Sequence, residues 1–417
     1  MMPKPSADNL LADEFEPGFV RPNYEEYCFA NVSPTVIDLL GVDIGRTLPA
    51  DVFDGVDTDV SNVLVVLIDG LRYDRWLESD APLFERARVR GRTTPLTSVY
   101  PSETAAAMIT YHTGTQPVEH GSLGWEQYLS EHQDTIEPLK GRTVDRRPFS
   151  EAFGDDPVEL FSGRTIHEKL GDEGISTAVV QPKRTISHEA APQIYAGTER
   201  VPYKSPAEGA IEAAEKVQQP DHSFVHIYYP DLDGVSHRGG TRAPHYEATL
   251  HMLANCLERA LESLDPAVAA DTLLLFAADH GHFDTNTDVG TVLTDRQAVT
   301  ESLARRDDGE LVMPSGGSRN AHLHLRDGTV ETVREALSDL DAHILTKTEA
   351  IERNLFGDGE PSEVFDRRCG DLVIVPNEEP VWYDPAKFDM VGQHGGLHPE
   401  EMIVPFTAVN VDTLLES

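Results

Sequence analysis

The sequence predicts an α/β protein built on a central, mostly parallel sheet. Apolar runs alternate along the chain with segments of helical periodicity, a pattern typical of βαβ units. Polar residues follow several of these runs directly, at the edge where the carboxyl ends of parallel strands would meet. The runs that we expect to form strands lie near residues 63–68, 176–181, 223–229, 272–278, 321–325, 371–376 and 403–409.

The segments between these runs predict the helices. Ser33 and Pro34 form a typical N-cap and first helical position, and Gly41 is placed to end the short helix that they begin. Longer helices are expected at residues 206–218, 244–264 and 329–340. The second of these carries one apolar stripe, formed by Leu250, Leu253, Leu257 and Leu261.

Two stretches do not fit the alternation. Residues 122–165 are rich in Glu, Asp and Arg, and residues 282–320 contain the turn-forming segment Pro314-Ser315-Gly316-Gly317. Because long connections in α/β folds commonly carry ligand selectivity, we expect these stretches to be lid or cap insertions.

The charge of the chain is strongly negative. Its 417 residues include 34 Lys and Arg against 72 Asp and Glu, a net charge of −38, and lysine is sparse. An acidic surface of this kind is screened at molar salt, where the Debye length is about 3 Å, so we expect a halophilic protein. An ordinary acidic protein of a low-salt organism is the alternative. The absence of basic patches in the sequence argues against binding of bare nucleic acid.

Cysteine usage and hydropathy indicate a cytoplasmic, soluble protein. Cys28, Cys256 and Cys369 are widely spaced and odd in number, which argues against a disulfide framework and against a thiolate metal site. The first residues contain no apolar signal segment, and no apolar run is long enough to cross a membrane. We therefore expect no membrane partner.

Carboxylates and imidazoles recur where strands are predicted to end. Asp279 and His280 follow the run 273–278, and Asp69 follows the run 63–68. The pattern repeats as Asp233-x-x-x-His237 after the run 224–229 and as His394-Gly395-Gly396 near the C-terminus. Such oxygen and nitrogen donors suit a divalent cation. Taken singly, each has a structural alternative, such as a turn cap for Asp69 or a surface pair for Asp233 and His237.

Thr104 is the candidate nucleophile. It lies in the segment Tyr100-Pro101-Ser102-Glu103-Thr104-Ala105, where a turn leads into strong helix formers, so it is expected in the first turn of a helix. That position favours a bound anion such as phosphate, and a nearby metal ion would lower the pKa of the hydroxyl. The alternative is that Thr104 only caps the helix.

In this order, the motifs resemble those of the type I phosphodiesterase/nucleotide pyrophosphatase family of the alkaline phosphatase superfamily, over roughly residues 60 to 410. The resemblance implies an alkaline-phosphatase-like three-layer sandwich. It also implies an N-terminal extension, residues 1–60, packed on a catalytic domain of residues 61–417. The insertions near 122–165 and 282–320 would belong to that domain.

The resemblance also implies two divalent metal ions, Zn²⁺ first, with Mn²⁺ or Fe²⁺ as substitutes. One ion would be held by Asp233, His237 and His394. The other would be held by Asp69, Asp279 and His280, with Thr104 facing it and reaching both ions. Asp231 competes with Asp233 as a ligand, and we choose Asp233 because its four-residue separation from His237 matches the motif.

The function expected on this basis is hydrolysis of a small-molecule phosphoester through a phospho-threonine intermediate, with diesters preferred over monoesters. Ala105-Ala106-Ala107 follows the threonine, where nucleotide-cleaving relatives commonly carry Phe-Pro-Asn, so the sequence does not favour nucleotides specifically. The alternatives are a phosphomonoesterase, a phosphonate hydrolase or a phosphotransferase of the same superfamily, or a metal-binding protein without turnover. The sequence does not predict an oligomeric state.

Overall fold

A computed structural model describes residues 6–219 and 222–416. Its central feature is a seven-stranded sheet in which one strand, β20, runs antiparallel to its neighbours and the others are parallel to one another. From one edge to the other, the strands are β4 (Arg92–Thr97), β20 (Ile403–Asn410), β11 (Thr272–Ala277), β3 (Asn62–Ile68), β10 (His222–Tyr229), β8 (Ser176–Pro182) and β9 (Glu199–Tyr203). The predicted α/β fold with a mostly parallel sheet is confirmed.

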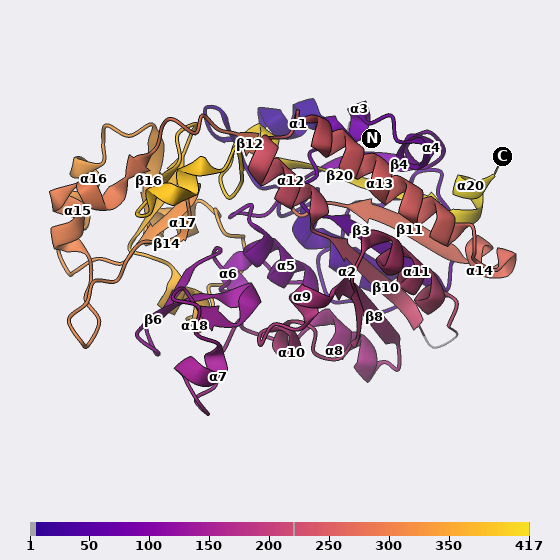
Figure 1. The fold of residues 1–417 in the computed structure, drawn as a ribbon, viewed down its shortest axis with the longest axis horizontal. Coiled ribbons are helices and arrows are strands. Elements are labelled where there is room, and N and C mark those ends of the chain that lie inside the picture. The colour runs from indigo at the N-terminus through magenta and orange to yellow at the C-terminus, as the bar shows by residue number, and fades with distance from the viewer. Residues whose placement is uncertain (1–5, 220–221, 417) are drawn as a thin grey trace.

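Helices cover both faces of this sheet (Figure 1). One layer contains α4 (Pro82–Arg90), α11 (Pro206–Val217) and α13 (Pro244–Leu261). The other contains α2 (Val32–Leu39), α5 (Thr104–Thr113) and α8 (Ile166–Asp172). The predicted stripe of α13 is buried in full: Leu250, Leu253, Leu257 and Leu261.

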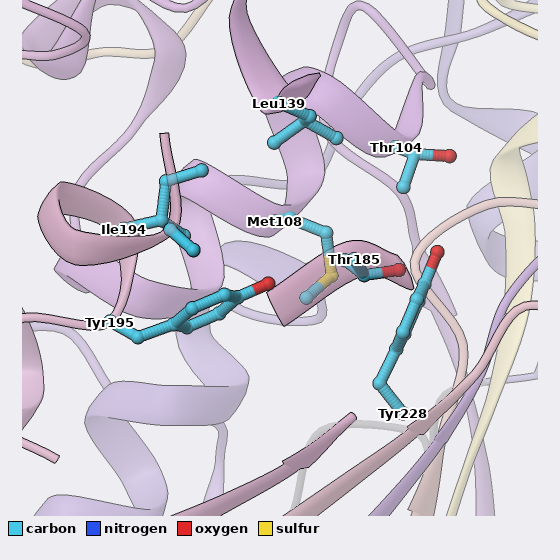
Figure 2. A pocket seen from close by; sticks show the side chains of 8 residues that line it. Thr104, Met108, Leu139, Thr185, Ile194, Tyr195 and Tyr228 are labelled. Carbon is cyan, nitrogen blue, oxygen red and sulfur yellow. The ribbon is translucent and has the colours of Figure 1, made fainter. Parts of the chain in front are cut away.

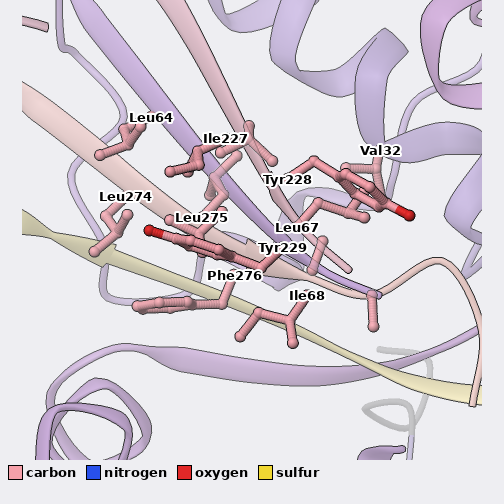
Figure 3. Packing of buried hydrophobic residues seen from close by; sticks show 14 of the residues in the cluster. Val32, Leu64, Leu67, Ile68, Ile227, Tyr228, Tyr229, Leu274, Leu275 and Phe276 are labelled. Carbon is pink, nitrogen blue, oxygen red and sulfur yellow. The ribbon is translucent and has the colours of Figure 1, made fainter. Parts of the chain in front are cut away.

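The core lies where β3 is flanked by β10 and β11. Val66 of β3 stands between Ile227 on one side and Phe276 on the other, and all three side chains are at most 1% exposed. Figure 3 shows how the apolar side chains of these strands gather between the layers. Strands that are covered on both faces need long apolar runs, so β3, β10 and β11 could be recognised in the sequence.

A second sheet lies apart from the first. The chain leaves the central sheet after β11 and returns to it only at β20. Between them it forms an antiparallel four-stranded sheet, in the order β14 (Ser315–Gly317), β15 (Asn320–Leu323), β17 (Leu372–Pro376) and β16 (Ala342–Thr346). The predicted strands 321–325 and 371–376 therefore exist, but their expected place in the parallel sheet was wrong. They pair with each other and bury a separate apolar cluster.

The acidic stretch 122–165 contains a small antiparallel sheet of its own. Its strands are β5 (Gln127–Leu129), β6 (Asp134–Glu137) and β7 (Arg142–Thr143). Two-stranded ladders join β1 (Glu14–Glu16) to β2 (Phe19–Val20), β12 (Phe283–Asp284) to β19 (Gly392–Gln393), and β13 (Thr291–Val292) to β18 (Val381–Trp382). The division of the chain into an extension and a catalytic domain stays a prediction, and residues 1–5, 220–221 and 417 of those ranges lie outside the described residues.

Two predicted helices differ in detail from the structure. Asn31, not Ser33, is the N-cap of α2, because a 3₁₀ turn at Phe29–Asn31 runs directly into the helix and places Ser33 inside it. Gly41 follows the end of α2 with φ +87°, in the left-handed region expected of a glycine stop. The helix predicted at 329–340 is shorter, α16 (Val330–Ala336).

The remaining helices are short. They are α1 (Ala7–Ala12), α3 (Tyr73–Glu78), α6 (Pro117–His120), α7 (Phe149–Ala152), α9 (Lys183–Ile186), α10 (Ala191–Ile194), α12 (Asp231–Gly239), α14 (Pro266–Ala270), α15 (Gln297–Ser302), α17 (Lys347–Glu352), α18 (Glu363–Arg368), α19 (Pro399–Met402) and α20 (Val411–Leu415). Among the described residues, no helix combines the length and the apolar character needed to cross a bilayer.

Candidate metal centre

The candidate site lies beyond the carboxyl ends of three adjacent strands. Asp69 directly follows β3, Asp279 comes two residues after β11, and Asp233 lies in α12, which begins after β10. Because β11, β3 and β10 are neighbours in the sheet, these carboxylates meet at one edge. This is the crevice in which open α/β sheets bind ligands.

The first cluster gathers imidazoles around Asp233. Its Oδ1 atom lies 3.1 Å from His237 Nε2, 3.1 Å from His282 Nε2 and 3.5 Å from His394 Nε2. Despite these distances, Asp233 Oδ1 and His282 Nε2 have no hydrogen-bond partner among the described residues. One donor atom from each of the four residues lies within 4.8 Å of the others, close enough to share one cation.

The second cluster surrounds His280. Its Nε2 atom lies 3.0 Å from Thr104 Oγ1, 3.2 Å from Asp69 Oδ1 and 3.5 Å from Asp279 Oδ2. Asp69 Oδ1 and Asp279 Oδ2 have no hydrogen-bond partner among the described residues. The atoms able to share one ion come from Asp69, His280 and Asp233, so Asp233 lies between the two clusters.

All four histidines of the two clusters are held in the same way. In each, Nδ1 is within hydrogen-bond distance of a backbone carbonyl, which can only accept, so Nδ1 is the donor of that contact and Nε2 is the ring nitrogen left for the site. The pairs are His237 with Gly392 at 2.7 Å, His280 with Gly281 at 2.9 Å, His394 with Ser102 at 3.1 Å and His282 with Gly70 at 3.3 Å. Histidines that bind metals are commonly oriented by such a contact.

The electrostatics also favour cations. Burial, together with the charges of Asp279 and Asp233, raises the pKa of Asp69 well above its usual value. Burial would raise the pKa of Asp233 too, but the adjacent His237 and His282 outweigh it and the pKa falls well below normal. Burial and the three neighbouring imidazoles of His280, His282 and His237 hold the pKa of His394 well below normal, so its ring is neutral. A neutral ring is the form that binds a metal ion.

Thr104 is the first residue of α5, and Glu103 is the N-cap, so Thr104 is not the capping residue. Its side chain also borders a small apolar hollow of about 20 Å³, room for about one water molecule. Figure 2 shows the hydroxyls of Thr104 and Tyr228 near one end of this hollow and Ile194 and Tyr195 at the other. Tyr228 donates a hydrogen bond to Asp69 Oδ2.

These residues fit a pair of divalent cations. Their donor set consists of carboxylate oxygens and imidazole nitrogens without thiolate, which suits Zn²⁺, Mn²⁺ or Fe²⁺. The structure brings together all the residues singled out in the sequence: Asp69, Thr104, Asp233, His237, Asp279, His280 and His394. Asp231 is absent from both clusters.

Sequence reasoning missed three residues of the site. His282 belongs to the first cluster, Tyr228 holds Asp69, and Glu103 lies beside Thr104 with its Oε1 atom unpartnered among the described residues. Burial raises the pKa of Glu103 to about 8. A signal existed for His282, since it stands two residues after His280 in the same loop.

A third group able to hold an ion lies outside the cleft. It comprises Asp80, Glu247 and His251, of which Asp80 is exposed and the other two are partly exposed. Ion pairs within the group already join His251 to Asp80 at 2.7 Å and to Glu247 at 3.7 Å. Exposed acidic groups of this kind are common without a metal.

The fold and the clustered ligands define an α/β protein with a candidate metal centre at the carboxyl edge of its sheet. Residues 63–397 match the model of the family described as type I phosphodiesterase / nucleotide pyrophosphatase. The chain belongs to this family of hydrolases, as the motifs indicated. No curated protein matches the chain.

Solved structures resemble the chain in fold. Murine ectonucleotide pyrophosphatase/phosphodiesterase 5 superposes with a TM-score of 0.64 at 17% identity, covering 84% of this chain and 88% of that one. An inactive variant of the murine protein in complex with AMP gives the same values. The human protein gives 0.64 at 16% identity, over 84% and 87%. At these identities the likeness concerns the fold.

Proposed function

We propose that the chain is a metal-dependent phosphodiesterase that acts through a phospho-threonine intermediate. The observation that carries this proposal is the arrangement of four histidines with Nδ1 on backbone carbonyls and Nε2 facing shared carboxylates, beside the hydroxyl of Thr104. Asp233, His237 and His394 would hold one cation, and Asp69, Asp279 and His280 the other. His282 is available to the first.

Two bound cations would supply charge neutralisation at the attacking and leaving oxygens and lower the proton affinity of the Thr104 hydroxyl. Thr104 Oγ1 loses its proton and bonds to phosphorus, while the bond between phosphorus and the leaving alcohol breaks and the alcohol takes up a proton. Water then cleaves the new phosphorus–oxygen bond and restores the hydroxyl. The net reaction converts a diester and water into a monoester and an alcohol.

The chain's own residues position these steps. Thr104 begins α5, so the unpaired N–H groups of the first helical turn face the phosphoryl oxygens. These donors take the place of the asparagine that Ala105-Ala106-Ala107 lacks. Tyr228 fixes Asp69 through its hydrogen bond, which keeps Oδ1 turned toward His280.

A substrate panel tests the proposal. Wild type, Thr104→Ala and Thr104→Ser are assayed at high salt, with added Zn²⁺ or Mn²⁺, on bis-p-nitrophenyl phosphate, p-nitrophenyl phosphate and a p-nitrophenyl ester of a nucleoside monophosphate. We expect wild type to prefer diesters, Thr104→Ala to lose turnover with its metal content retained, and Thr104→Ser to keep part of the activity. Unchanged cleavage by Thr104→Ala would refute the nucleophile. Metal binding without cleavage of any ester would favour a transferase or a binding protein.

A further inference from the structure

Thr104 opens into a cleft of about 540 Å³ whose floor is the candidate metal centre. One wall comes from the stretch 125–146, with its small sheet of β5, β6 and β7, and the other from residues 316–318 and 382–393. The walls therefore come from segments outside the central sheet. A group bound by these segments would lie in the same cleft as a substrate held at the metal centre.

Four cations line this cleft in a chain of net charge −38. Three come from residues 140–146, which include β7, and the fourth comes from the C-terminal part of the lining: Lys140, Arg142, Arg146 and Lys387. Fewer carboxylates than cations form ion pairs around Lys140, Arg142 and Arg146. Glu137 pairs with both Lys140 and Arg142, so one anion serves two cations. Lys387 lies 3.8 Å from Glu126.

Arg146 has no carboxylate within ion-pair distance among the residues that the structure describes. Its backbone has φ 73°, a left-handed conformation that non-glycine residues rarely adopt. The turn is closed by a hydrogen bond from Arg146 N to Thr143 O at 2.9 Å. Residues held in this way are concentrated at ligand sites, and here the turn holds an unpaired guanidinium at the cleft.

The wall is built for charge rather than for an apolar group. Lys140 Nζ lies 4.5 Å from the centre of the Trp125 ring and so covers one face of it, and the indole N–H donates to Glu137 at 3.1 Å. Between the two sets of lining residues, the Tyr383 hydroxyl donates to Glu126 at 2.7 Å. Trp125 and Tyr383 are thus engaged with charged neighbours. The charged side chain of this wall that has no ion-pair partner among the described residues is a cation, Arg146.

From this arrangement we infer that the wall of Lys140, Arg142 and Arg146 binds a second anionic group of the substrate. The inference rests on the proposed function, since the scissile phosphate would lie on the metal centre and the three cations line the same cleft without belonging to either cluster. The substrate is then a phosphoester that carries a further phosphate or carboxylate on the group attached to the scissile phosphorus. Arginine suits this task because its planar fork binds oxyanions through paired hydrogen bonds.

Matched diesters test the inference. One is 4-nitrophenyl phenyl phosphate, and the others carry a carboxylate or a phosphonate at the para position of the phenyl arm; release of nitrophenolate is followed at one fixed salt concentration. Wild type is expected to favour the charged arms by about tenfold in kcat/KM. A larger preference for the phosphonate over the carboxylate identifies a phosphorus oxyanion as the second group.

Two neighbouring arginines supply the variant and its control. Arg146→Gln is expected to bring the ratio of charged-arm to neutral-arm kcat/KM close to one. Arg147→Gln makes the same charge change next door, but Arg147 pairs with Asp145 and Asp134 and lines a different hollow, so the wild-type ratio is expected to persist. Equal ratios in wild type and Arg146→Gln overturn the inference, and so does a wild-type ratio of one or less.

A binding measurement separates this inference from the proposed function. Calorimetry of Thr104→Ala with 4-carboxyphenyl phosphate and with phenyl phosphate needs no turnover. The charged ligand is expected to bind about tenfold more tightly, and the additional Arg146→Gln change is expected to remove that difference. If no diester is cleaved but the binding difference is present, the proposed function fails and the second anion site stands. If diesters are cleaved and the two ligands bind equally, the second anion site fails and the proposed function stands.

Discussion

The Nε2 atom of His282 lies 3.1 Å from Oδ1 of Asp233 without forming a hydrogen bond to it. His282 is fully buried, and its other ring nitrogen is within hydrogen-bond distance of Gly70 O. Two buried polar atoms left unpaired at this distance would be unfavourable unless a third partner lies between them. A cation shared with His237 and His394 is such a partner.

We therefore expect His282→Ala to weaken zinc binding by about tenfold to a hundredfold, the range found when groups around a metal ligand are removed. Competition with a chromogenic chelator gives the affinity. His251→Ala is the matched control, because His251 belongs to the acidic group outside the cleft. Equal affinities for wild type and His282→Ala would show that His282 has no part in the metal site.

Metal removal is expected to lower stability as well as activity. Without cations, the carboxylates of Asp69, Asp233 and Asp279 face one another, and their charges raise the pKa of Asp69 and Asp279 after the larger effect of burial. Free zinc at 100 times its Kd would add about 2.7 kcal/mol per site to the free energy of unfolding. Thermal unfolding before chelation, after chelation and after zinc is restored measures this. A midpoint that does not move while bound metal falls to zero would contradict it.

Acid is expected to destabilise the protein through three buried histidines, one each in α5, α8 and β10. Burial lowers the pKa of His167 and His226 to about 3 and that of His112 well below normal. Unfolded, these rings bind protons below about pH 6.5, so the free energy of unfolding falls as the pH decreases from there toward 3.

His226→Phe measures the contribution of one of these histidines. The change removes no hydrogen bond, because neither ring nitrogen of His226 has a partner among the described residues. The slope of unfolding free energy against pH is expected to fall by about 1.4 kcal/mol per pH unit between pH 6 and 4. Urea unfolding at several pH values at fixed salt measures the slope. The same slope in both proteins would show that His226 is not held neutral.

Salt is expected to stabilise the chain. The net charge is −38, so the acidic side chains repel one another in dilute buffer. Salt screens this repulsion, because the Debye length falls from about 10 Å at 0.1 M to about 3 Å at 1 M salt. The thermal midpoint should therefore rise with KCl in the range from 0.1 to 2 M. Sucrose at matched viscosity is the control. A midpoint independent of KCl would contradict the expectation of a halophilic protein.

A buried ion pair ties the second sheet to the C-terminal loop. Arg319, in the turn between β14 and β15, donates to Glu401 of α19 at 2.8 Å through two nitrogens, and both side chains are fully buried. Arg319→Met leaves the buried carboxylate without its cation, with only the N–H groups of Gly396 and His398 donating to it, and is expected to cost about 3–5 kcal/mol in urea unfolding. The double variant Arg319→Met/Glu401→Met should recover most of that loss. If the two changes simply add, the pair is not coupled.

Much of the candidate site could be predicted because its carboxylates follow strands that are apolar along most of their length. Asp69, Asp233 and Asp279 were found in this way, and β3, β10 and β11 are indeed neighbours. His394 rested on the family motif, since no strong strand precedes it. His282 was missed because one further histidine in a loop carries no periodic signal.

The fold was less predictable at its margins. The edge strands β4 and β9 went unrecognised because they are polar in part, and each contains a proline, Pro95 and Pro202, which edge strands tolerate. Residues 321–323 and 372–376 were recognised as strands but assigned to the wrong sheet. Apolar character indicates that a strand is buried, whereas its partner is decided by contacts far away in the sequence.

The backbone contacts of the four histidines have a consequence for how the protein matures. His237 is oriented by the carbonyl of Gly392, and the ligands themselves extend from Asp69 to His394. A ribosome must release almost the whole chain before the first cluster, which includes His394, can close, whereas every member of the second cluster has been made once His280 is out. Loading of the first site would then be a late event in biosynthesis, because incomplete chains lack one of its donor groups.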